Sequence, residues 1–376
     1  MNSIPDLFST FGHILQDRLF PRLREELGEM SEQHEEFVRA LALLQMDGFA
    51  AVRRGRGRPP HDRAKIARAF LAKAVFHISD TRALLNRLAH DVVLRRLCGW
   101  EEAAQIPDET VFSRSFAEFA RGQFAQRVHA AVIERTQQER LVGHILRDTT
   151  AIEVREKPGP KPKPAAPAGR RLHRKAGGIK RPEQMTRLER QCSGMTLTEM
   201  LAELPRNCDV GCKLDSRGNK YRWSGYKLHL DVADGQIPIS CVLTSASVND
   251  TQAAIPLMLI SAQRVTSLYE LMDTGYDCAA IREKSRELGH VPIIPFQKRG
   301  SQQPELAPHQ QGRLRERTAV ERVFSRLKDE YGATRVRVRG SAKVMTHLMF
   351  GILALTADQI LRWSRGQPPE PCQVHA

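Results

Sequence analysis

Three acidic residues are candidates for a ligand-binding site. Asp148 lies within LRDTTAIE, part of a run rich in β-branched residues that predicts a strand, and a charge there is costly unless it binds something. Asp273 follows the apolar run SLYELM, at the carboxyl end of a second predicted strand, where α/β sheets place ligands. Glu321 lies on a predicted helix late in the chain. Together they suggest an acidic site for a divalent cation.

The helix around Glu321 has two interpretations. At about 100° per residue, Arg317 lies about −40° and Lys328 about −20° from Glu321, so the three share a face. A separate apolar stripe is predicted to pack on a sheet, and it comprises Val320, Val323, Phe324 and Leu327. Glu321 could ligate a metal while the cations hold phosphates. On the helix alone, an exposed Arg317–Glu321 pair worth about 0.3–0.5 kcal/mol is the simpler interpretation.

Other residues compete for roles at such a site. Asp250, in ASVNDTQ, is an alternative second acid, but capping of the helix that follows explains it more simply, so Asp273 is preferred. Either Asn249 or Asp250 is predicted to be that cap. Lys227 and His229 share one face of a predicted strand and would either contact DNA or lie on an exposed sheet face. Trp223 would stack on an unpaired base or, more simply, pack in the core.

The motif RGRGRPP at 54–60 contains Arg54, Arg56 and Arg58. Arginines spaced in this way resemble a hook that enters the minor groove of A·T-rich DNA. The alternative is a flexible basic lead-in to the helix predicted from about residue 62. Contact with phosphates is expected in both cases.

The composition favours a nucleic-acid partner. Lys and Arg number 58 against 43 acidic residues in 376 residues, which gives a net charge of +15. Such a balance favours polyanions, with an anionic membrane surface as the weaker alternative. Neither a secretory signal nor a membrane-spanning helix is predicted, because charged and polar residues interrupt the apolar runs. Seven scattered cysteines favour reduced thiols in a cytoplasm, and Cys208 and Cys212 lack a second Cys/His pair for zinc.

The predicted elements divide the chain in two. Residues 1–140 read as helical, with helices at 62–78, 79–100, 106–124 and 125–141. Residues 141–365 begin with a strand at 141–154 and continue after a basic arm with strands at 224–233, 237–246, 267–273 and 291–296. The turn DGQ at 234–236 predicts that the strands at 224–233 and 237–246 form a hairpin. Helices are predicted at 249–264, 277–289, 314–330 and 343–364. This order indicates an α/β fold with a mixed sheet flanked by helices.

A basic, proline-rich segment interrupts the second part. Residues 155–190 hold twelve Lys and Arg, three Glu and six Pro, a composition that cannot bury a core. We therefore predict a largely flexible insertion over 155–222, which either follows the DNA backbone or is a solvated loop. Residues 366–376 are predicted to be a tail.

The acids, the cations and several longer stretches resemble the DDE transposases of bacterial insertion sequences, in particular the group with a Y-(2)-R-(3)-E-(6)-K signature. The signature tyrosine would fall at position 314, which is leucine here. The stretches that carry the resemblance are 57–99 (GRPPHDRAKIARAFLAKAVFHISDTRALLNRLAHDVVLRRLCG), 106–116 (IPDETVFSRSF), 223–254 (WSGYKLHLDVADGQIPISCVLTSASVNDTQAA), 271–277 (LMDTGYD) and 316–340 (ERTAVERVFSRLKDEYGATRVRVRG).

The resemblance implies a ribonuclease-H-like fold in which Asp148, Asp273 and Glu321 bind two Mg²⁺ ions, with Mn²⁺ as a substitute. Arg317 and Lys328 would neutralise phosphates, and the helices at 62–140 would recognise the terminal inverted repeats of the element. A homodimer or higher multimer on double-stranded DNA is implied as well. Three functions remain open: a transposase, an inactive or domesticated relative that only binds DNA, and a nuclease without strand transfer.

Overall fold

The computed structural model of the chain describes residues 19–50, 60–159, 185–214, 218–297, 305–334 and 336–366. Arg54, Arg56 and Arg58 lie outside the described residues. So do positions 160–184 of the basic arm and all but the first residue of the predicted tail.

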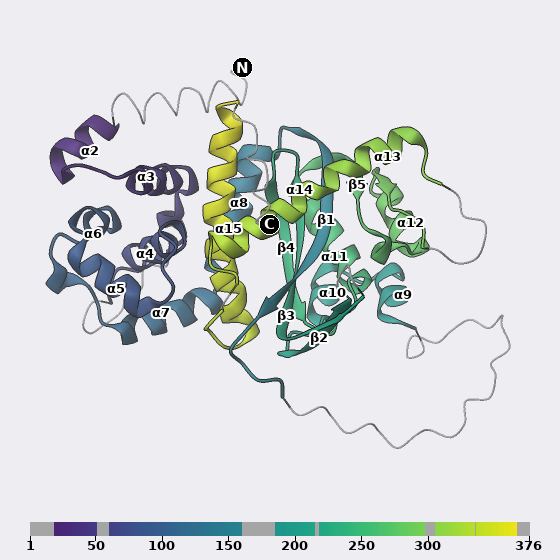
Figure 1. The fold of residues 1–376 in the computed structure, drawn as a ribbon, viewed down its shortest axis with the longest axis horizontal. Helices are drawn as coiled ribbons and strands as arrows, with labels where there is room; N and C mark the ends of the chain where they lie inside the picture. Colours follow the sequence, from purple (N-terminus) through teal and green to yellow (C-terminus); the bar gives the residue numbers. More distant parts are fainter. Residues whose placement is uncertain are drawn as a thin grey trace.

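The amino-terminal part is helical, as predicted (Figure 1). Its α-helices are α2 (Phe20–Leu27), α3 (Glu32–Leu44), α4 (Arg63–Val75), α5 (Thr81–His90), α6 (Val92–Cys98), α7 (Glu109–Arg121) and α8 (Phe124–Gln137). The single helix predicted over 79–100 is wrong, because Asp91 leaves helical geometry and its side chain accepts a 2.9 Å hydrogen bond from the Leu94 N–H. This aspartate therefore ends one helix and caps the next.

A six-stranded mixed sheet forms the second part. Its strands are β1 (Leu141–Glu153), β2 (Asp209–Leu214), β3 (Lys220–Ala233), β4 (Ile237–Ser245), β5 (Thr266–Leu271) and β6 (Val291–Ile293). The order is β2-β3-β1-β5-β6, and β4 also pairs with β3. β3 is antiparallel to β1, β2 and β4, whereas β1, β5 and β6 are parallel to one another. The predicted mixed sheet and the hairpin of β3 and β4 are confirmed.

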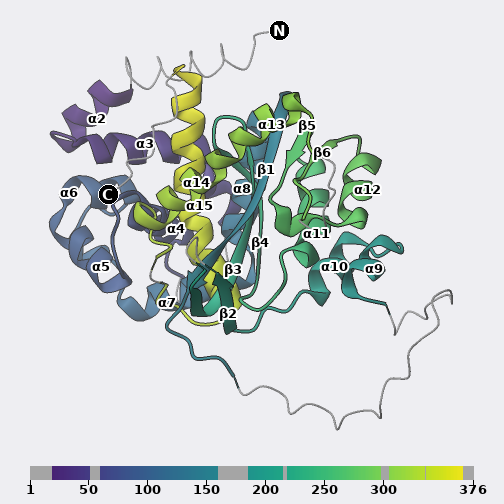
Figure 2. The same ribbon diagram turned by 45° about the vertical axis from the view of Figure 1, so that its right-hand side comes forward.

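Helices cover both faces of the sheet (Figures 1 and 2). α11 (Thr251–Ala262) packs on β3 and β4, and α12 (Ala279–Glu287) lies beside it. On the other face, α14 (Thr318–Asp329) packs on β1, and α15 (Ser341–Ser364) packs on β4. Short α13 (Pro308–Leu314) precedes α14. This α/β arrangement is consistent with the ribonuclease-H-like fold that the resemblance implies.

The segment 155–222 has more regular structure than the prediction of a largely flexible insertion allowed. Its described part includes α9 (Arg187–Cys192), α10 (Leu197–Glu203) and β2, and it reaches the start of β3. Each of the two helices begins with a capping box, formed by Thr186 with Glu189 and by Thr196 with Glu199. Most of the basic and proline residues lie upstream of these two helices. The average composition of the segment therefore concealed the helix starts that the capping boxes mark.

The core is continuous between the amino-terminal helices and the sheet, because α15 lies between them (Figure 1). Phe350 of α15 packs against Phe70, Phe116 and Phe124, with ring centroids 5.7–6.4 Å apart. One residue earlier, Met349 contacts Cys241 of β4. Of the described helices, α15 alone is long and apolar enough to cross a membrane, but 83% of its apolar window is buried inside the protein. It is a core helix.

Gly225 is required where β1 and β3 cross closely. Its φ is +151°, and a Cβ added there would lie 2.1 Å from the carbonyl oxygen of Ile152. We expect Gly225→Ala to lower the free energy of unfolding by roughly 1–3 kcal/mol, because the two strands must separate to admit the methyl group. Urea unfolding checks this. The control is Gly312→Ala, where a Cβ meets no atom within 4 Å, and an equal effect of both substitutions would contradict the argument.

Candidate active site

The sheet brings Asp148 and Asp273 to the same place. β1 and β5 are parallel with Leu146 opposite Leu271, so continuing this register by two residues sets Asp148 opposite Asp273. Asp148 Oδ1 accepts a 2.7 Å hydrogen bond from the N–H of Thr149. Asp273 Oδ1 accepts a 2.9 Å bond from the N–H of Gly275, in the 3₁₀ turn Thr274–Tyr276 that follows β5. Both carboxylates thus have fixed positions at the end of β5.

The third acid, Glu321, lies on α14. Val320, Val323, Phe324 and Leu327 are buried, as the apolar stripe predicts, and they hold the helix against β1. Arg317, at the start of this helix, donates from Nη1 to Asp148 Oδ2 at 3.0 Å and from Nη2 to Glu321 Oε1 at 3.2 Å. The Arg317–Glu321 pair is therefore more than an exposed helix contact, because the same guanidinium joins it to the strand acid 169 residues away.

The site carries more negative charge than its own cations balance. Burial raises the pKa of Asp148 to about 6, and the charges of Asp273 and Glu321 add to the shift against Arg317. Burial also raises the pKa of Asp273, with a contribution from Asp250. The pKa of Asp148 thus responds to the charges of both other acids, which places all three in one cluster. Raised carboxylate pKa values of this kind are typical of sites that receive a cation.

A metal can be tested against these residues. Three carboxylates offer the hard oxygen ligands that Mg²⁺ prefers. Among the described residues, however, no three His, Cys, Asp or Glu side chains are already arranged as a metal site. Arg317 lies between Asp148 and Glu321. The donor set therefore fits a divalent cation, and the Arg317 guanidinium must leave at least one carboxylate for a cation to bind.

Lys227 and Asp250 form a second ion pair beside the acids. Lys227 Nζ donates to Asp250 Oδ1 at 2.7 Å and to the carbonyl of Val248 at 2.9 Å. Of the two residues predicted to cap α11, Asn249 accepts the Thr251 N–H, whereas Asp250 occupies the N-cap position without a capping bond from its side chain. Asp250 has helical backbone angles, which leave its carboxylate free to meet Lys227.

Lys328 lies on α14, as Glu321 does, but it is near the other end of the helix. Its neighbouring charges are those of Lys213, Glu153 and Asp329, and burial lowers its pKa. Lys328 therefore lies near the Glu153 end of β1 and not among the three acids.

His229 and Trp223 do not fit the DNA contacts predicted for them. His229 is 1% exposed, and its Nε2 lies 2.8 Å from Thr244 Oγ1. Trp223 is 4% exposed and donates from Nε1 to the carbonyl of Tyr226 at 3.0 Å. The predicted exposed sheet face for His229 is also wrong, because α11 and the neighbouring strands cover it. For Trp223, the simpler alternative of core packing holds.

The buried His229 predicts a loss of stability in acid. Burial lowers its pKa from 6.5 to about 4, so below pH 6.5 the unfolded chain binds a proton that the folded chain does not. We expect stability to fall from about pH 6.5 to about pH 4, with His229 contributing about 3 kcal/mol. His229→Gln should flatten this slope in urea unfolding. Exposed His90→Gln is the control, and identical slopes for all three proteins would contradict the assignment.

Two features near the acids escaped the sequence analysis. Arg147, next to Asp148 on the opposite face of β1, forms a buried cluster with Asp231 and Glu270. The hydroxyl of Tyr276 is buried without a hydrogen-bond partner among the described residues. The signal for the first was present, since two adjacent charges in one strand must point to opposite faces, and each then needs a partner.

Two family models match the chain. The Transposase domain (DUF772) matches residues 23–118, and the Transposase DDE domain matches residues 209–357. Asp273 and Glu321 lie inside the second region, whereas Asp148 lies outside both. No curated protein and no solved structure gives a significant match. Both matched regions are described as transposase domains, and together they support a DDE-type transposase.

Proposed function

We propose that the chain is an insertion-sequence transposase that binds the terminal inverted repeats of its element and catalyses metal-dependent cleavage and transfer of DNA strands. The observation that carries this is the link through Arg317 between Asp148 and Glu321, with Asp273 opposite Asp148 in the strand register. An acidic cluster assembled from two strands and a late helix is the arrangement that such chemistry needs.

The three carboxylates have one role in this proposal and Arg317 has another. Asp148, Asp273 and Glu321 would hold two Mg²⁺ ions, or Mn²⁺ in their place. Such ions supply activation of a water or a 3′-hydroxyl and stabilisation of the leaving oxygen at a phosphodiester. Arg317 keeps the carboxylates together beforehand and, once released from one of them, is placed to donate two parallel hydrogen bonds to a phosphate.

DNA binding would use residues outside this cluster. Arg54, Arg56 and Arg58 are proposed to reach the minor groove, and the amino-terminal helices to recognise the inverted repeats. Lys328 would contact a phosphate further along the duplex, at the far end of β1. The proposed assembly is a dimer or higher multimer on DNA in the cytoplasm. Membership of the Y-R-E-K group belongs to the proposal too, although Leu314 packs against the core and has no hydroxyl to offer.

The alternative is a catalytically inactive or domesticated transposase that acts by binding DNA. The observation that favours it is Leu314, which stands where the signature of the Y-R-E-K group has its tyrosine. This alternative predicts that the protein binds the ends of the element but does not cleave DNA with any divalent metal.

The deciding experiment uses DNA that carries the ends of the element together with a target duplex. We expect cleaved ends and joined target products with Mg²⁺ or Mn²⁺, and neither product with a chelator. End binding without cleavage would support the alternative. Cleavage without a joined product would indicate a nuclease and contradict the transposase.

A further inference from the structure

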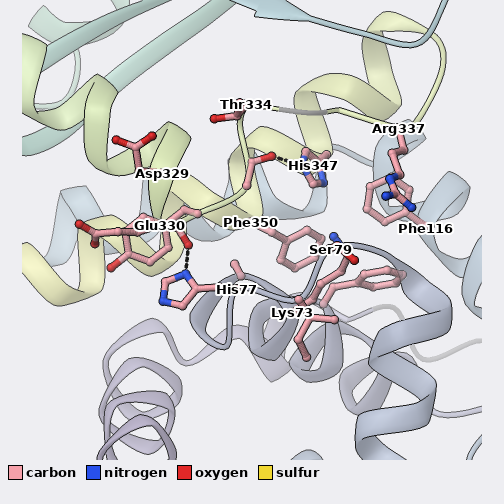
Figure 3. Close-up of a pocket in the computed structure, with 15 residues that line it drawn as sticks. Lys73, His77, Ser79, Phe116, Asp329, Glu330, Thr334, Arg337, His347 and Phe350 are labelled. Atoms are coloured by element: carbon pink, nitrogen blue, oxygen red, sulfur yellow. Dashed lines mark hydrogen bonds between the residues drawn. The ribbon is translucent and has the colours of Figure 1, made fainter. Parts of the chain in front are cut away.

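A cavity opens where the amino-terminal helices meet the segment that follows α14. Its volume is about 300 Å³. Lys73, His77 and Ser79 approach it from one side, and Arg337 and His347 approach it from the other (Figure 3). A second hollow of about 360 Å³ shares Lys73 and Arg337 with the first, and adds Arg339 and Lys343 to its lining. We call the two together the seam groove.

Lys73 is the least satisfied charge in the seam groove. Its ammonium group makes no hydrogen bond and no ion pair with the described residues, although burial lowers its pKa to about 8. The opposite charge that acts on Lys73 is that of Asp80. This carboxylate is already used, since it accepts from Arg337 at 2.6 Å and caps α5 through the Ala83 N–H at 2.9 Å. Lys73 is therefore a partly buried cation without a paired anion, which a bound anionic ligand would supply.

The other charged groups around the groove also leave an excess of positive charge. Arg339 and Lys343 make no hydrogen bond or ion pair within the described part of the chain. Glu330, an acid on the rim, is engaged by Arg326 at 2.6 Å, and its carbonyl binds the His77 ring. His347 is held by the carbonyl of Gly332 at 3.0 Å, and burial, with the charge of Lys73, lowers its pKa to about 4, so it is neutral at pH 7. Of the remaining lining acids, Glu109 pairs with Arg82, and Asp329 has no hydrogen-bond or ion-pair partner among the described residues. Three unpaired cations, Lys73, Arg339 and Lys343, therefore face one unpaired acid, which leaves an excess of positive charge.

The shape of the groove indicates which anion it takes. The rings of Phe70, Phe116 and Phe350 pack against one another beneath it, so they offer no open slot for a base. Lys73 comes from α4, whereas Arg339 and Lys343 come from the chain around the start of α15. Cations spread over two elements suit a run of phosphates better than a single small ion.

We propose that the seam groove binds backbone phosphates of DNA. This rests on the proposed function and adds a contact made jointly by the amino-terminal helices and the catalytic part. Asp329, on the rim, is eight residues after Glu321 on α14, which corresponds to about 12 Å along the helix axis. One duplex can therefore reach both the groove and the acids.

Protection of lysines from acetylation tests the groove in the unaltered protein. A mixed-sequence duplex is expected to protect Lys73 and Lys343, as measured by mass spectrometry, while inorganic phosphate is not. Lys284 of α12, which pairs with Glu287, is the control and should react equally throughout. Helix α12 lies across the sheet from the amino-terminal helices (Figure 1). Protection by inorganic phosphate alone would identify a small-ion site, and unprotected lysines would exclude the groove as a DNA site.

Substitutions give an independent measurement. Lys73→Met and Lys343→Gln should each weaken binding of the mixed-sequence duplex about five- to tenfold at ~0.1 M salt and reduce the salt slope by about 0.9. Arg286→Gln, an equal change of charge on exposed α12, should alter neither. If the unaltered protein binds and cleaves DNA while both groove variants match it, the groove is wrong and the proposed function stands. A protein that binds no DNA at all overturns both.

Discussion

Glu321→Gln is expected to reduce Mg²⁺-dependent strand cleavage by about a thousandfold or more while leaving DNA binding unchanged. The amide has nearly the same shape as the carboxylate but contributes no negative charge to a cation. Loss of one anionic ligand removes several kcal/mol of transition-state stabilisation, and about 4 kcal/mol corresponds to about a thousandfold in rate. Asp148→Asn and Asp273→Asn should act in the same way. Single-turnover cleavage of element-end DNA measures all three.

The matched control is Glu316→Gln, which changes an exposed acid in the 3₁₀ turn just before α14. It should cleave like the unaltered protein. Full activity in Glu321→Gln alone would remove this residue from the site, and full activity in all three variants would overturn the catalytic assignment. Because Glu321 is 57% exposed, its substitution should leave the unfolding midpoint almost unchanged, so a lost activity cannot be ascribed to misfolding.

Arg147→Met is expected to lower the free energy of unfolding by about 3–5 kcal/mol, the largest effect on stability that we predict. Arg147 binds both oxygens of Asp231, at 2.8 and 2.7 Å, and also Glu270 Oε1 at 3.2 Å. All three side chains are at most 1% exposed. Methionine fills a similar volume but leaves two buried carboxylates without a cation. Urea unfolding at pH 7 measures the loss.

Two comparisons separate lost charge from lost packing. Adding Asp231→Asn and Glu270→Gln to Arg147→Met should recover much of the stability, because no buried charge then remains. In the single variant the two carboxylates have raised pKa values, so its deficit relative to the unaltered protein should shrink as the pH falls from 7 towards 4.5. A deficit that is small, or independent of pH, would contradict the ionic explanation.

The buried cluster also matters for the acids on the other face. Arg147 joins β1 to β3 through Asp231 and to β5 through Glu270. Since the register of β1 on β5 sets Asp148 opposite Asp273, these ion pairs help to fix the distance between two acids that they never touch.

Local patterns predicted much of the fold and the acids themselves. The hairpin of β3 and β4 and the apolar stripe of α14 each follow from a short stretch of sequence. Even the resemblance depended on residues that lie close together along the chain. These patterns were enough to select Asp148, Asp273 and Glu321.

Long-range partners could not be predicted in the same way. Alternation placed Lys227 and His229 on one face of β3 but could not show that α11 would cover that face and bury His229. Asp250 was assigned to a cap because nothing nearby in sequence revealed Lys227, 23 residues earlier, as its partner. Arg147 found its partners 84 and 123 residues away. Pairings of this kind depend on topology, which single stretches do not encode.

The position of α15 limits how the specificity of this protein could be re-engineered. Its Phe350 completes the packing of α4, α7 and α8, while its other side covers β4. A chimera that took only the first helices from a relative would thus carry half of an interface whose other half is encoded more than 200 residues later. Under the proposal that the amino-terminal helices recognise the inverted repeats, an exchange of specificity would require α15 to be transplanted together with those helices.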